Sequence, residues 1–338
     1  MQTLLVTGGA GFIGSNFVRF VRSERPDVRV VNVDALTYSG NPDNLADLEG
    51  DANYRFVHAD ITDADAMDPL VAEADAVVHF AAESHVDRSI QDSRPFIRTN
   101  VTGTQTLLDA ARRAGYVEAG KRFLHVSTDE VYGQLPLDRP DLLFTEETPL
   151  QPNSPYAASK AGSDLLVRAA FHTHALDAVI TRCSNNFGPY QFPEKVIPLF
   201  ITNLLQGKTV PLYGDGKNVR DWLHVVDHCE AILAALEKGK AGEVYNIGGN
   251  NERSNLELTH ALIELCGRDE SAIEYVPDRL GHDRRYAIDA SKAQRELGWT
   301  PTRSAWPDAL EATVQWYKDH ETWWRRVQSG EYQRAFTT

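Results

Sequence analysis

The sequence predicts an α/β fold: a Rossmann-type doubly wound parallel sheet with a smaller mixed α/β substrate-binding lobe. Three observations support this prediction. Short apolar runs alternate with segments of helical pattern over the first half of the chain. The runs are apolar on both faces, as strands buried in a parallel sheet are. A glycine-rich turn follows the first run, and this order of elements is typical of doubly wound sheets.

The expected elements follow one another in a regular order. The six strands are QTLLVTG, VRVVNVDA, NYRFVHADI, ADAVVHFAA, RFLHVSTD and LDAVITRCS. The main helices are expected at 12–24, 63–73, 95–114, 155–174, 255–266 and 308–319. After about residue 185 prolines, glycines and aromatic residues become frequent, which indicates a looser lobe. We therefore expect a dinucleotide-binding domain over 1–184 and a substrate lobe over 185–338, with elements near 222–250 returning to the main sheet.

Composition excludes several classes of protein. Hydrophobic residues make up 42% and charged residues 24% of the 338 residues, as in ordinary soluble domains. A net charge of −14 argues against general binding of nucleic acids or anionic membranes. The first apolar run breaks at glycines, so we expect neither a signal peptide nor a membrane span. Cys183, Cys229 and Cys266 have no metal or redox spacing. No metal site is expected, and the location predicted for the chain is the reducing cytoplasm.

The run VTGGAGFIGSNF predicts a dinucleotide site. It places Gly9, Gly11 and Gly14 in a G-x-G-x-x-G pattern between a strand and a helix, and Asp34 ends the second strand about 20 residues later. Glycines let the backbone approach a pyrophosphate, and the helix N-terminus offers N–H groups and positive dipole. A carboxylate at Asp34 accepts both ribose hydroxyls and repels a 2′-phosphate, which favours NAD over NADP. The alternative is a glycine turn that only packs the helix on the strand.

Tyr156 and Lys160 are the candidate groups for oxidation of a hydroxyl. They are four residues apart in SPYAASK, and therefore on one face of the expected helix. A free phenol is a poor base at neutral pH. We expect the Lys160 ammonium, together with a cationic nicotinamide, to lower the pKa of Tyr156. The spacing alone also occurs on helix surfaces by chance; after a dinucleotide pattern and a strand that ends in Ser127 and Thr128, it indicates a catalytic pair.

Eight runs of the sequence resemble one enzyme family. They are TGGAGFIGS, DALTYSGN, AAESHVDRSI, STDEVYG, SPYAASKA, FPEKVIP, YGDGKNVRDWLHVVDH and GHDRRYAID. Their order is similar to that in nucleotide-sugar 4,6-dehydratases of the dTDP-glucose type, within the extended short-chain dehydrogenase/reductase superfamily. The resemblance implies a lyase that uses NAD and acts on dTDP-glucose, and a homodimer built through the helices near 95–115 and 155–174.

The resemblance also implies which residues form the site. The implied catalytic residues are Thr128, Asp129, Glu130, Tyr156 and Lys160. The implied cofactor contacts are Gly8, Gly11, Phe12, Ile13, Gly14, Asp34, Leu36, Thr37, Asp60, Ile61, Ala81, Ala82, Ser84, Thr99, Ser127, Tyr156, Lys160 and Asn186. The implied substrate contacts are Ser84, Thr128, Asn185, Glu194, Lys195, Val196, Pro211, Tyr213, Arg220, Asn255, Arg279 and His282. Arg220, Arg279, Arg284 and Arg285 form a local positive cluster suited to phosphate, although each could equally be in a surface ion pair.

The triplet TDE determines the reaction class that we expect. A ketone at C4 of a hexose acidifies the C5 proton, which Glu130 would remove, and Asp129 would protonate the C6 hydroxyl as it leaves. Neighbouring carboxyls tend to separate their pKa values into one acid and one base. Adjacent residues of a regular strand point to opposite faces, so both can reach one sugar only if the chain leaves β geometry there. The alternative for this pair is a solvated turn or helix cap.

Other functions stay open at this point. A UDP-hexose 4-epimerase shares the cofactor and Tyr/Lys groups but typically lacks the two carboxyls. This epimerase is the first alternative, a 4,6-dehydratase acting on another nucleotide sugar, such as GDP-mannose, is a second, and a dinucleotide-binding redox sensor is the non-enzymatic one. Two positions depart from the family pattern: Leu280 stands where relatives usually have proline, and Phe187 where they usually have tyrosine. His79 and His85 are expected to be structural.

Overall fold

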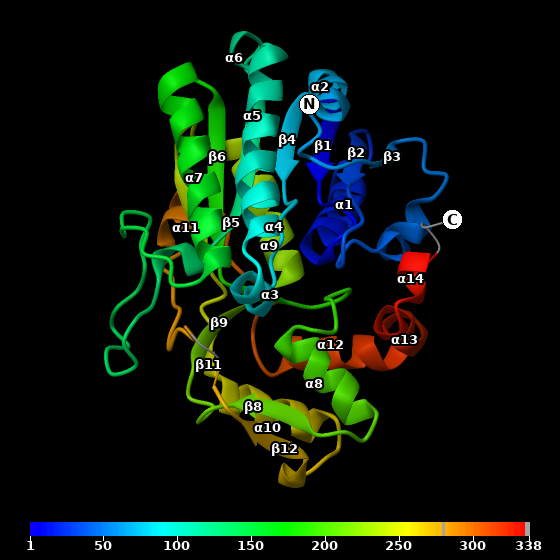
Figure 1. The fold of residues 1–338 in the computed structure, drawn as a ribbon, viewed down its shortest axis with the longest axis vertical. Helices are drawn as coiled ribbons and strands as arrows, with labels where there is room; N and C mark the ends of the chain where they lie inside the picture. Colours follow the sequence, from blue (N-terminus) through cyan, green and yellow to red (C-terminus); the bar gives the residue numbers. More distant parts are fainter. Residues whose placement is uncertain (279–280, 335–338) are drawn as a thin grey trace.

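The computed structural model describes residues 1–278 and 281–334, and a seven-stranded sheet forms its centre (Figure 1). The strand order is β10-β6-β5-β4-β1-β2-β3, and every neighbouring pair is parallel. The strands are β1 (Thr3–Thr7), β2 (Arg29–Asp34), β3 (Tyr54–His58), β4 (Ala76–His79), β5 (Arg122–Thr128), β6 (Asp177–Cys183) and β10 (Val244–Ile247). The predicted fold class and the six predicted strands are confirmed.

Helices cover both faces of this sheet. One face packs against α1 (Phe12–Glu24), α9 (Val225–Lys238) and α11 (Ser291–Leu297). The other packs against α2 (Ala64–Glu73), α5 (Thr104–Arg113) and α7 (Pro155–His174). Successive strand residues point to opposite faces, so in β1 Leu4 and Val6 join the first core and Leu5 joins the second. This two-sided burial explains why the strand sequences are continuously apolar.

The helix expected over 95–114 is interrupted. The structure has α4 (Arg94–Phe96), a π-helical segment η2 (Ile97–Gly103) and then α5. The Asn100 amide, on η2, accepts a hydrogen bond from the Glu83 N–H at 2.8 Å and donates to the Ser159 hydroxyl at 2.8 Å. A Cβ on Gly103 would lie 2.5 Å from the Ile61 side chain, so η2 packs tightly beneath the loop after β3. Such π segments occur frequently at functional sites.

The second lobe has a core of its own below the carboxyl ends of the main strands (Figure 1). Its strands are β7 (Asn185–Phe187), β8 (Val210–Tyr213), β9 (Val219–His224), β11 (Glu252–Ser254) and β12 (Ile273–Val276). Its helices are α8 (Val196–Leu205), α10 (Asn255–Leu265), α12 (Asp308–Asp319), α13 (Glu321–Ser329) and α14 (Glu331–Arg334). The remaining short segments are η1 (Pro42–Leu48), α3 (Val86–Gln91), α6 (Tyr116–Ala119), η3 (Asp129–Tyr132) and η4 (Glu270–Ala272). Phe187 is fully buried here, with its ring edge-on to Trp222 and Trp306.

The chain crosses between the two bodies more than once. After β9 it returns as α9 and β10, and β10 pairs in parallel with β6. Later α11 also packs on α9, an element that the sequence patterns did not indicate. The division at residue 184 stays a prediction.

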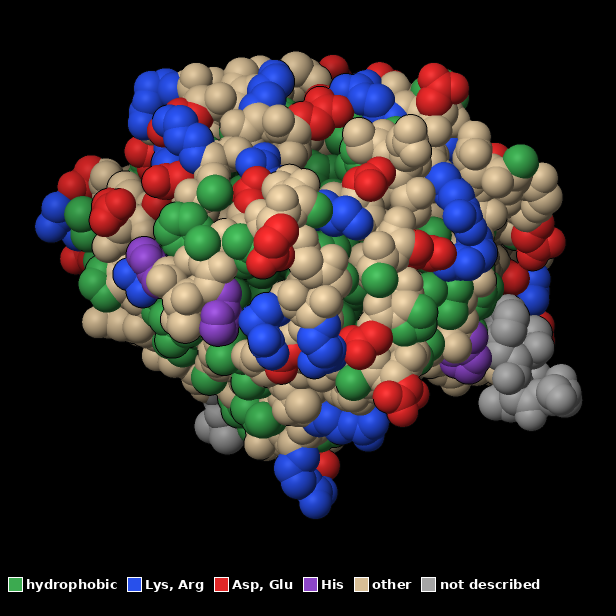
Figure 2. All heavy atoms as spheres, turned by 90° about the horizontal axis from the view of Figure 1, so that it is seen from above, with side chains coloured by type: hydrophobic (Ala, Val, Ile, Leu, Met, Phe, Trp, Pro, Cys, Tyr) green, Lys and Arg blue, Asp and Glu red, His purple; other side chains and the backbone are tan. Residues whose placement is uncertain are grey.

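Among the described residues, no helix has both the length and the apolar character needed to cross a bilayer. On the face seen in Figure 2, acidic and basic side chains of the described residues intermingle, without a continuous basic surface.

Asp227, on α9, holds residues 299–304 against this helix through hydrogen bonds. Its buried carboxylate accepts hydrogen bonds from the backbone N–H groups of Thr302 at 3.0 Å and Arg303 at 2.9 Å, and from the Ser304 hydroxyl at 2.6 Å. The Trp299 indole donates to the Asp227 backbone carbonyl at 3.0 Å. The Asp227 side chain thus accepts from three successive residues of this segment.

We expect Asp227→Asn to destabilise the protein. The substitution turns part of the acceptor into a donor that faces N–H groups, and an unsatisfied buried group of this kind costs about 2 to 3 kcal/mol. Chemical denaturation measures the loss, with the exposed Asp138→Asn as the matched control. Equal stability of the two variants would contradict the fastening role.

Candidate functional site

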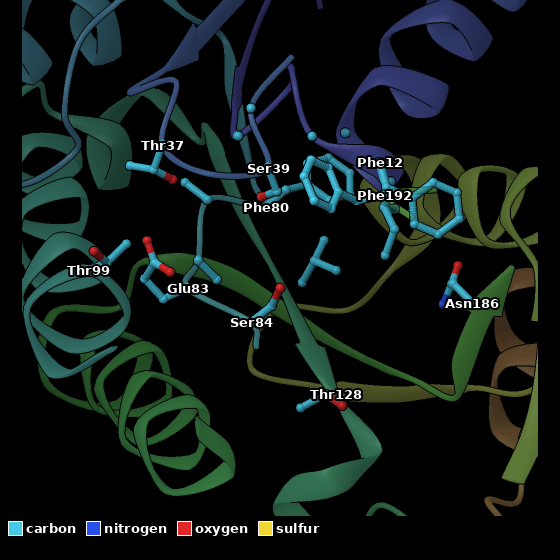
Figure 3. Close-up of a pocket in the computed structure, with 18 of the residues that line it drawn as sticks. Phe12, Thr37, Ser39, Phe80, Glu83, Ser84, Thr99, Thr128, Asn186 and Phe192 are labelled. Carbon is cyan, nitrogen blue, oxygen red and sulfur yellow. The ribbon is translucent and has the colours of Figure 1, made fainter. Parts of the chain in front are cut away.

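An open cavity of about 310 Å³ lies at the carboxyl ends of the central strands, where doubly wound sheets bind their ligands. Residues from β2, β5 and β6 and from the loops after β1 and β4 line it on one side, and residues within the segment 184–195 line it on the other. Figure 3 looks into this cavity: Thr37, Glu83 and Thr99 lie opposite Phe12, Phe192 and Asn186, and Thr128 lies at the end. The cavity is therefore bounded by both bodies of the protein.

The turn between β1 and α1 requires glycine at several positions. Gly8 has φ +72°, a conformation that favours glycine. A Cβ on Gly14 would lie 2.2 Å from the Gly8 carbonyl oxygen, and one on Gly9 would lie 2.2 Å from Asn32 Oδ1. Gly11 is the N-cap of α1 and provides no side-chain cap, so the helix N-terminus faces the cavity as an anion-binding end. The structure thus has the cradle that the glycine pattern predicts.

Asp34 is held in place at the end of β2. Its carboxylate accepts hydrogen bonds from Ala10 N–H at 3.0 Å and Leu36 N–H at 2.8 Å. Burial raises the pKa of Asp34, against these two backbone bonds, which lower it. Leu36, with φ +50°, is not among the residues that line the cavity. Its N–H orients the carboxylate, so the structure places Leu36 behind Asp34.

The other predicted cofactor residues lie together at this cavity. Those lining it are Gly8, Gly11, Phe12, Ile13, Gly14, Asp34, Thr37, Asp60, Ile61, Ala81, Ala82, Ser84, Thr99, Ser127, Tyr156, Lys160 and Asn186. They come from turns far apart in the sequence, and the parallel sheet brings these turns to one edge. Their individual roles toward a cofactor stay predictions.

The chain leaves β geometry at the TDE triplet, as both carboxyls require. β5 ends at Thr128, and η3 begins at Asp129. The Thr128 hydroxyl caps η3 by accepting the Glu130 N–H at 3.3 Å, and it lies 3.4 Å from Asp129 Oδ1. Glu130 lines the cavity, whereas Asp129 is 2% exposed and lies behind the lining. A strand that turns into a tight helix thus brings Glu130 to the end of the cavity and leaves Asp129 just behind it.

The surroundings of Asp129 favour a neutral carboxyl. Burial raises its pKa well above the ordinary value, and the nearby charges of Glu130 and Asp221 raise it further, against Arg220, which lowers it. Asp221 is itself fixed by hydrogen bonds from Gly249 N–H at 2.8 Å and Asn251 N–H at 2.6 Å. Among the described residues, Asp129 Oδ2 is buried without a hydrogen-bond partner. Asp129 is therefore suited to donate a proton.

The structure corrects the expectation about Tyr156. Its pKa is raised well above the ordinary value, chiefly by burial and then by the charge of Glu130, while the Thr128 hydroxyl lowers it. Lys160 lies one helical turn away on α7 but donates to the Val126 carbonyl at 2.9 Å. Burial also lowers the pKa of Lys160 to about 8. The predicted lowering of the Tyr156 pKa by Lys160 is therefore wrong for the protein groups alone, because burial dominates.

The structure divides the predicted substrate residues into two groups. Those lining the cavity are Ser84, Thr128, Asn185, Glu194 and Lys195. Those outside its lining are Val196, Pro211, Tyr213, Arg220, Asn255 and His282, all in the second lobe. Arg279 and Leu280 fall outside the described residues. Roles for both groups in substrate binding stay predictions.

The described members of the arginine cluster, Arg220, Arg284 and Arg285, contact other protein groups. Arg220 is buried, donates to the Asp283 carbonyl at 2.9 Å and stacks over the Tyr286 ring at 4.2 Å. Arg284 pairs with Asp215 at 3.1 Å, and Arg285 pairs with Glu252 at 2.7 Å. The ion-pair alternative is therefore the one found for Arg284 and Arg285.

Several lining residues were not singled out from the sequence. Tyr38, Glu83, Phe80, Gln191 and Phe192 line the cavity beside the predicted residues. The Tyr332 hydroxyl, on α14, donates to the Tyr38 carbonyl, and Arg88 stacks over the Tyr38 ring at 4.1 Å. Burial raises the pKa of Glu83. The available signal was position: Glu83 lies directly after the end of β4, at the edge where the site forms. Within residues 1–278 and 281–334, no group of His, Cys, Asp and Glu could hold a metal ion.

We expect Asp129→Asn to stabilise the protein in a pH-dependent way. A carboxyl whose folded pKa is raised destabilises the fold increasingly as the pH rises from the unfolded to the folded value. Asn does not ionise, so the gain in the free energy of unfolding should be small near pH 4 and larger at pH 8. Denaturant unfolding at the two pH values measures it. A gain that is equal at both values would show that the carboxyl is not the source.

The comparisons with known proteins agree with this geometry. The profile of the GDP-mannose 4,6 dehydratase family matches residues 5–306. A dTDP-glucose 4,6-dehydratase from Streptomyces niveus is 53% identical over 330 residues, covering 96% of each chain. One from Mycobacterium tuberculosis is 52% identical over 322 residues, covering 95% of each chain.

Solved structures give the same result. DesIV, a dTDP-glucose 4,6-dehydratase from Streptomyces venezuelae with NAD and a second ligand bound, is 54% identical with a TM-score of 0.91, covering 96% of this chain and 100% of that one. A UDP-glucose 4-epimerase from Thermotoga maritima, solved with UDP-glucose, is 30% identical with a TM-score of 0.84, covering 94% and 99%. The chain therefore belongs to the nucleotide-sugar 4,6-dehydratase family, on its dTDP-glucose branch.

Proposed function

We propose that the protein converts dTDP-glucose to dTDP-4-keto-6-deoxyglucose and water, with NAD regenerated in each turnover. The observation that carries this proposal is the pair Asp129 and Glu130 at the end of β5, beside Tyr156 and Lys160. Oxidation and re-reduction need only Tyr156 and the cofactor. Elimination of water needs an acid and a base in addition, and this pair provides both. The names of the relatives support the same substrate.

The cavity fits NAD. The glycine turn packs closely against α1, since a Cβ on Gly14 would meet the backbone of Gly8, and Gly11 lies at the lining of the cavity. α1 directs its N-terminus to this cavity, where a pyrophosphate would bind. Asp34 presents a carboxylate to the ribose, which disfavours NADP. When bound, NAD accepts hydride from C4 of the hexose and returns it to C6. The further residues that would hold it are those of the predicted set that line the cavity.

Tyr156 is the proposed base for the C4 hydroxyl. The Thr128 hydroxyl lowers the pKa of Tyr156, so it is placed to orient both the phenol and the sugar hydroxyl. Lys160 projects from the next turn of the same helix face and brings a positive charge to the lining of the cavity. Positive charge at this place favours the phenolate, whose formation burial opposes.

Glu130 and Asp129 carry out the elimination. The C4 ketone acidifies C5, and Glu130 takes that proton while the C6–O bond breaks. Asp129 gives its proton to the leaving hydroxyl, which departs as water and leaves a C5=C6 double bond. After hydride reaches C6, Glu130 returns its proton to C5. The proton that Tyr156 took from the C4 hydroxyl equals in number the one that Asp129 gave, so the total proton count of the enzyme is unchanged. A proton must then pass from Tyr156 to Asp129 before the next turnover.

The wider setting is part of the proposal. We place the enzyme in the cytoplasm, in the synthesis of deoxysugars such as rhamnose, as a homodimer. Cys183 and Cys229 are buried free thiols, in keeping with a reducing compartment. Leu165 on α7 and Ile97 on η2 are 56% and 49% exposed, and these two segments pack together. Exposed apolar side chains on adjacent helices suit a partner subunit, so this surface supports the dimer expected from the family.

We expect Glu130→Gln to retain reduction of the cofactor but lose elimination by at least about 100-fold, the usual contribution of a general base. Absorbance at 340 nm measures the first step, and mass spectrometry of the nucleotide sugar measures the second. The exposed Glu118→Gln is the matched control. In deuterated water the wild-type product should carry deuterium at C5.

Three results would count against this function. If Glu130→Gln lost cofactor reduction and water elimination to the same extent, Glu130 would not be a base that acts in the elimination alone. A product without deuterium at C5 would reject the proposed base. A product that keeps its C6 hydroxyl would identify a 4-epimerase instead.

We expect Leu165→Glu to dissociate the dimer, because it would bury a carboxylate in an apolar contact. Light scattering after size-exclusion chromatography gives the mass of each form. Leu137→Glu, at an exposed loop residue, is the control and should leave the dimer intact. A wild-type protein that elutes as a monomer would refute the proposed assembly.

A further inference from the structure

A buried polar cluster lies directly behind Lys160. We define it as Lys160, His125, Asp164, Arg182 and Tyr132, all of them buried. Tyr156, Lys160 and Asp164 follow one another at intervals of four residues, so they share one face of α7. His125 and Arg182 come from the neighbouring strands β5 and β6. The cluster therefore continues the catalytic face of α7 away from the cavity.

His125 occupies the centre of the cluster. Its Nε2 lies 3.4 Å from Lys160 Nζ, 3.4 Å from Asp164 Oδ1 and 3.1 Å from the Ser163 hydroxyl. Among the described residues, its Nδ1 has no hydrogen-bond partner. All polar contacts of this ring therefore pass through the one nitrogen that faces the lysine. An ammonium can only donate, so Nε2 must accept if it is to hold Lys160.

Asp164 is the negative charge of the cluster. Its Oδ2 accepts from Arg182 Nε at 2.8 Å, and Arg182 also donates to the Tyr132 hydroxyl at 2.9 Å. The pair of Arg182 and Asp164 is neutral as a whole, but the other oxygen of Asp164 lies 3.4 Å from His125 Nε2. The charge of Asp164 also raises the pKa of Lys160, because a nearby buried carboxylate favours the charged form of a lysine.

We propose that His125 and Asp164 are positioning residues that keep Lys160 in its ammonium form and so set the upper pH limit of the reaction. The inference rests on the function proposed above. His125 accepts one N–H of the ammonium, while Asp164 supplies the counter-charge and Arg182 fixes Asp164. As the pH rises, Lys160 loses a proton, and with it the positive charge beside the cofactor and Tyr156.

The titratable groups around Lys160 agree with this assignment. Burial, with the charge of Lys160, lowers the pKa of His125 to about 4, so its imidazole is neutral and able to accept at pH 7. Against the effect of burial, the charge of Arg182 lowers the pKa of Asp164 to about 2. Burial lowers the pKa of Lys160 to about 8, and Asp164 limits that fall.

Three further groups face the cluster. His79 on β4 packs against His125, with ring centroids 5.1 Å apart and the rings tilted by 40°, but its nitrogens are engaged by Thr7 at 2.7 Å and Thr104 at 2.9 Å. Cys183 on β6 and Tyr156 on α7 are the others, and burial raises the pKa of each. At neutral pH these three groups are uncharged, which leaves Asp164 as the anion that supports Lys160.

The test measures the pKa of Lys160 by NMR titration of NAD-loaded protein labelled with 13C at lysine Cε, the signal being assigned by its loss in Lys160→Arg. We expect Asp164→Asn and His125→Leu each to lower this pKa by about one unit or more, because each removes support for the ammonium. His125→Gln should restore most of the value, since its amide oxygen can accept. The fall of kcat at alkaline pH with dTDP-glucose should move by the same amount.

Tyr132→Phe is the matched control. It removes a buried hydrogen bond of Arg182 but no charge and no contact of Lys160, so the titration should stay unchanged. An unchanged Lys160 in Asp164→Asn, or an equal shift in Tyr132→Phe, would overturn the proposal. If Asp164→Asn does not fold, the proposal is tested by comparing the pKa of Lys160 in His125→Leu with that in His125→Gln. If dTDP-glucose is not turned over at all, the proposed function fails while the NMR titration still tests the cluster.

Discussion

The burial of the Asp129 carboxyl beside two other carboxyls is the constraint on which the site depends. A charged Asp129 would be strongly disfavoured there, so the group is kept as an acid. The strand must end at Thr128 and turn into η3 to place Glu130 at the cavity while Asp129 stays behind it. Asp221 must in turn be fixed by backbone N–H groups from the loop after β10. Much of the local fold serves to hold these charges in place.

Burial of ionisable groups has different effects on the two sides of α7. Toward the cavity, burial makes the Tyr156 phenol harder to ionise. Away from the cavity, Arg182, Asp164 and His125 form a charged network within an otherwise apolar layer between α7 and the sheet. In a buried network of this kind the loss of one member leaves the others without a partner, which is costly. Chemistry at the cavity and packing at the sheet are therefore coupled through one helix.

Much of this arrangement could be predicted from sequence, for particular reasons. The six strands were visible because a sheet buried on both faces needs continuous apolar runs, and the glycine turn because backbone contacts exclude side chains there. The break in the helix over 95–114 was hidden, because an α and a π segment share the same apolar pattern. The effect of burial on the pKa of Tyr156 was missed because spacing along a helix shows proximity but not burial, while the effect of a bound nicotinamide stays a prediction. Leu36 lies behind Asp34 because a left-handed backbone turns it away from the cavity.

The contact between Tyr332 and Tyr38 joins the last described helix to a loop near the start of the chain. Tyr332 is buried, and its ring also packs edge-on against Phe192 of the cavity lining. The outer wall of the pocket is thus built from three widely separated stretches of polypeptide. During synthesis on the ribosome, that wall can close only after nearly the whole nascent chain has emerged, so an unfinished polypeptide cannot retain its nucleotide in the way the released protein does.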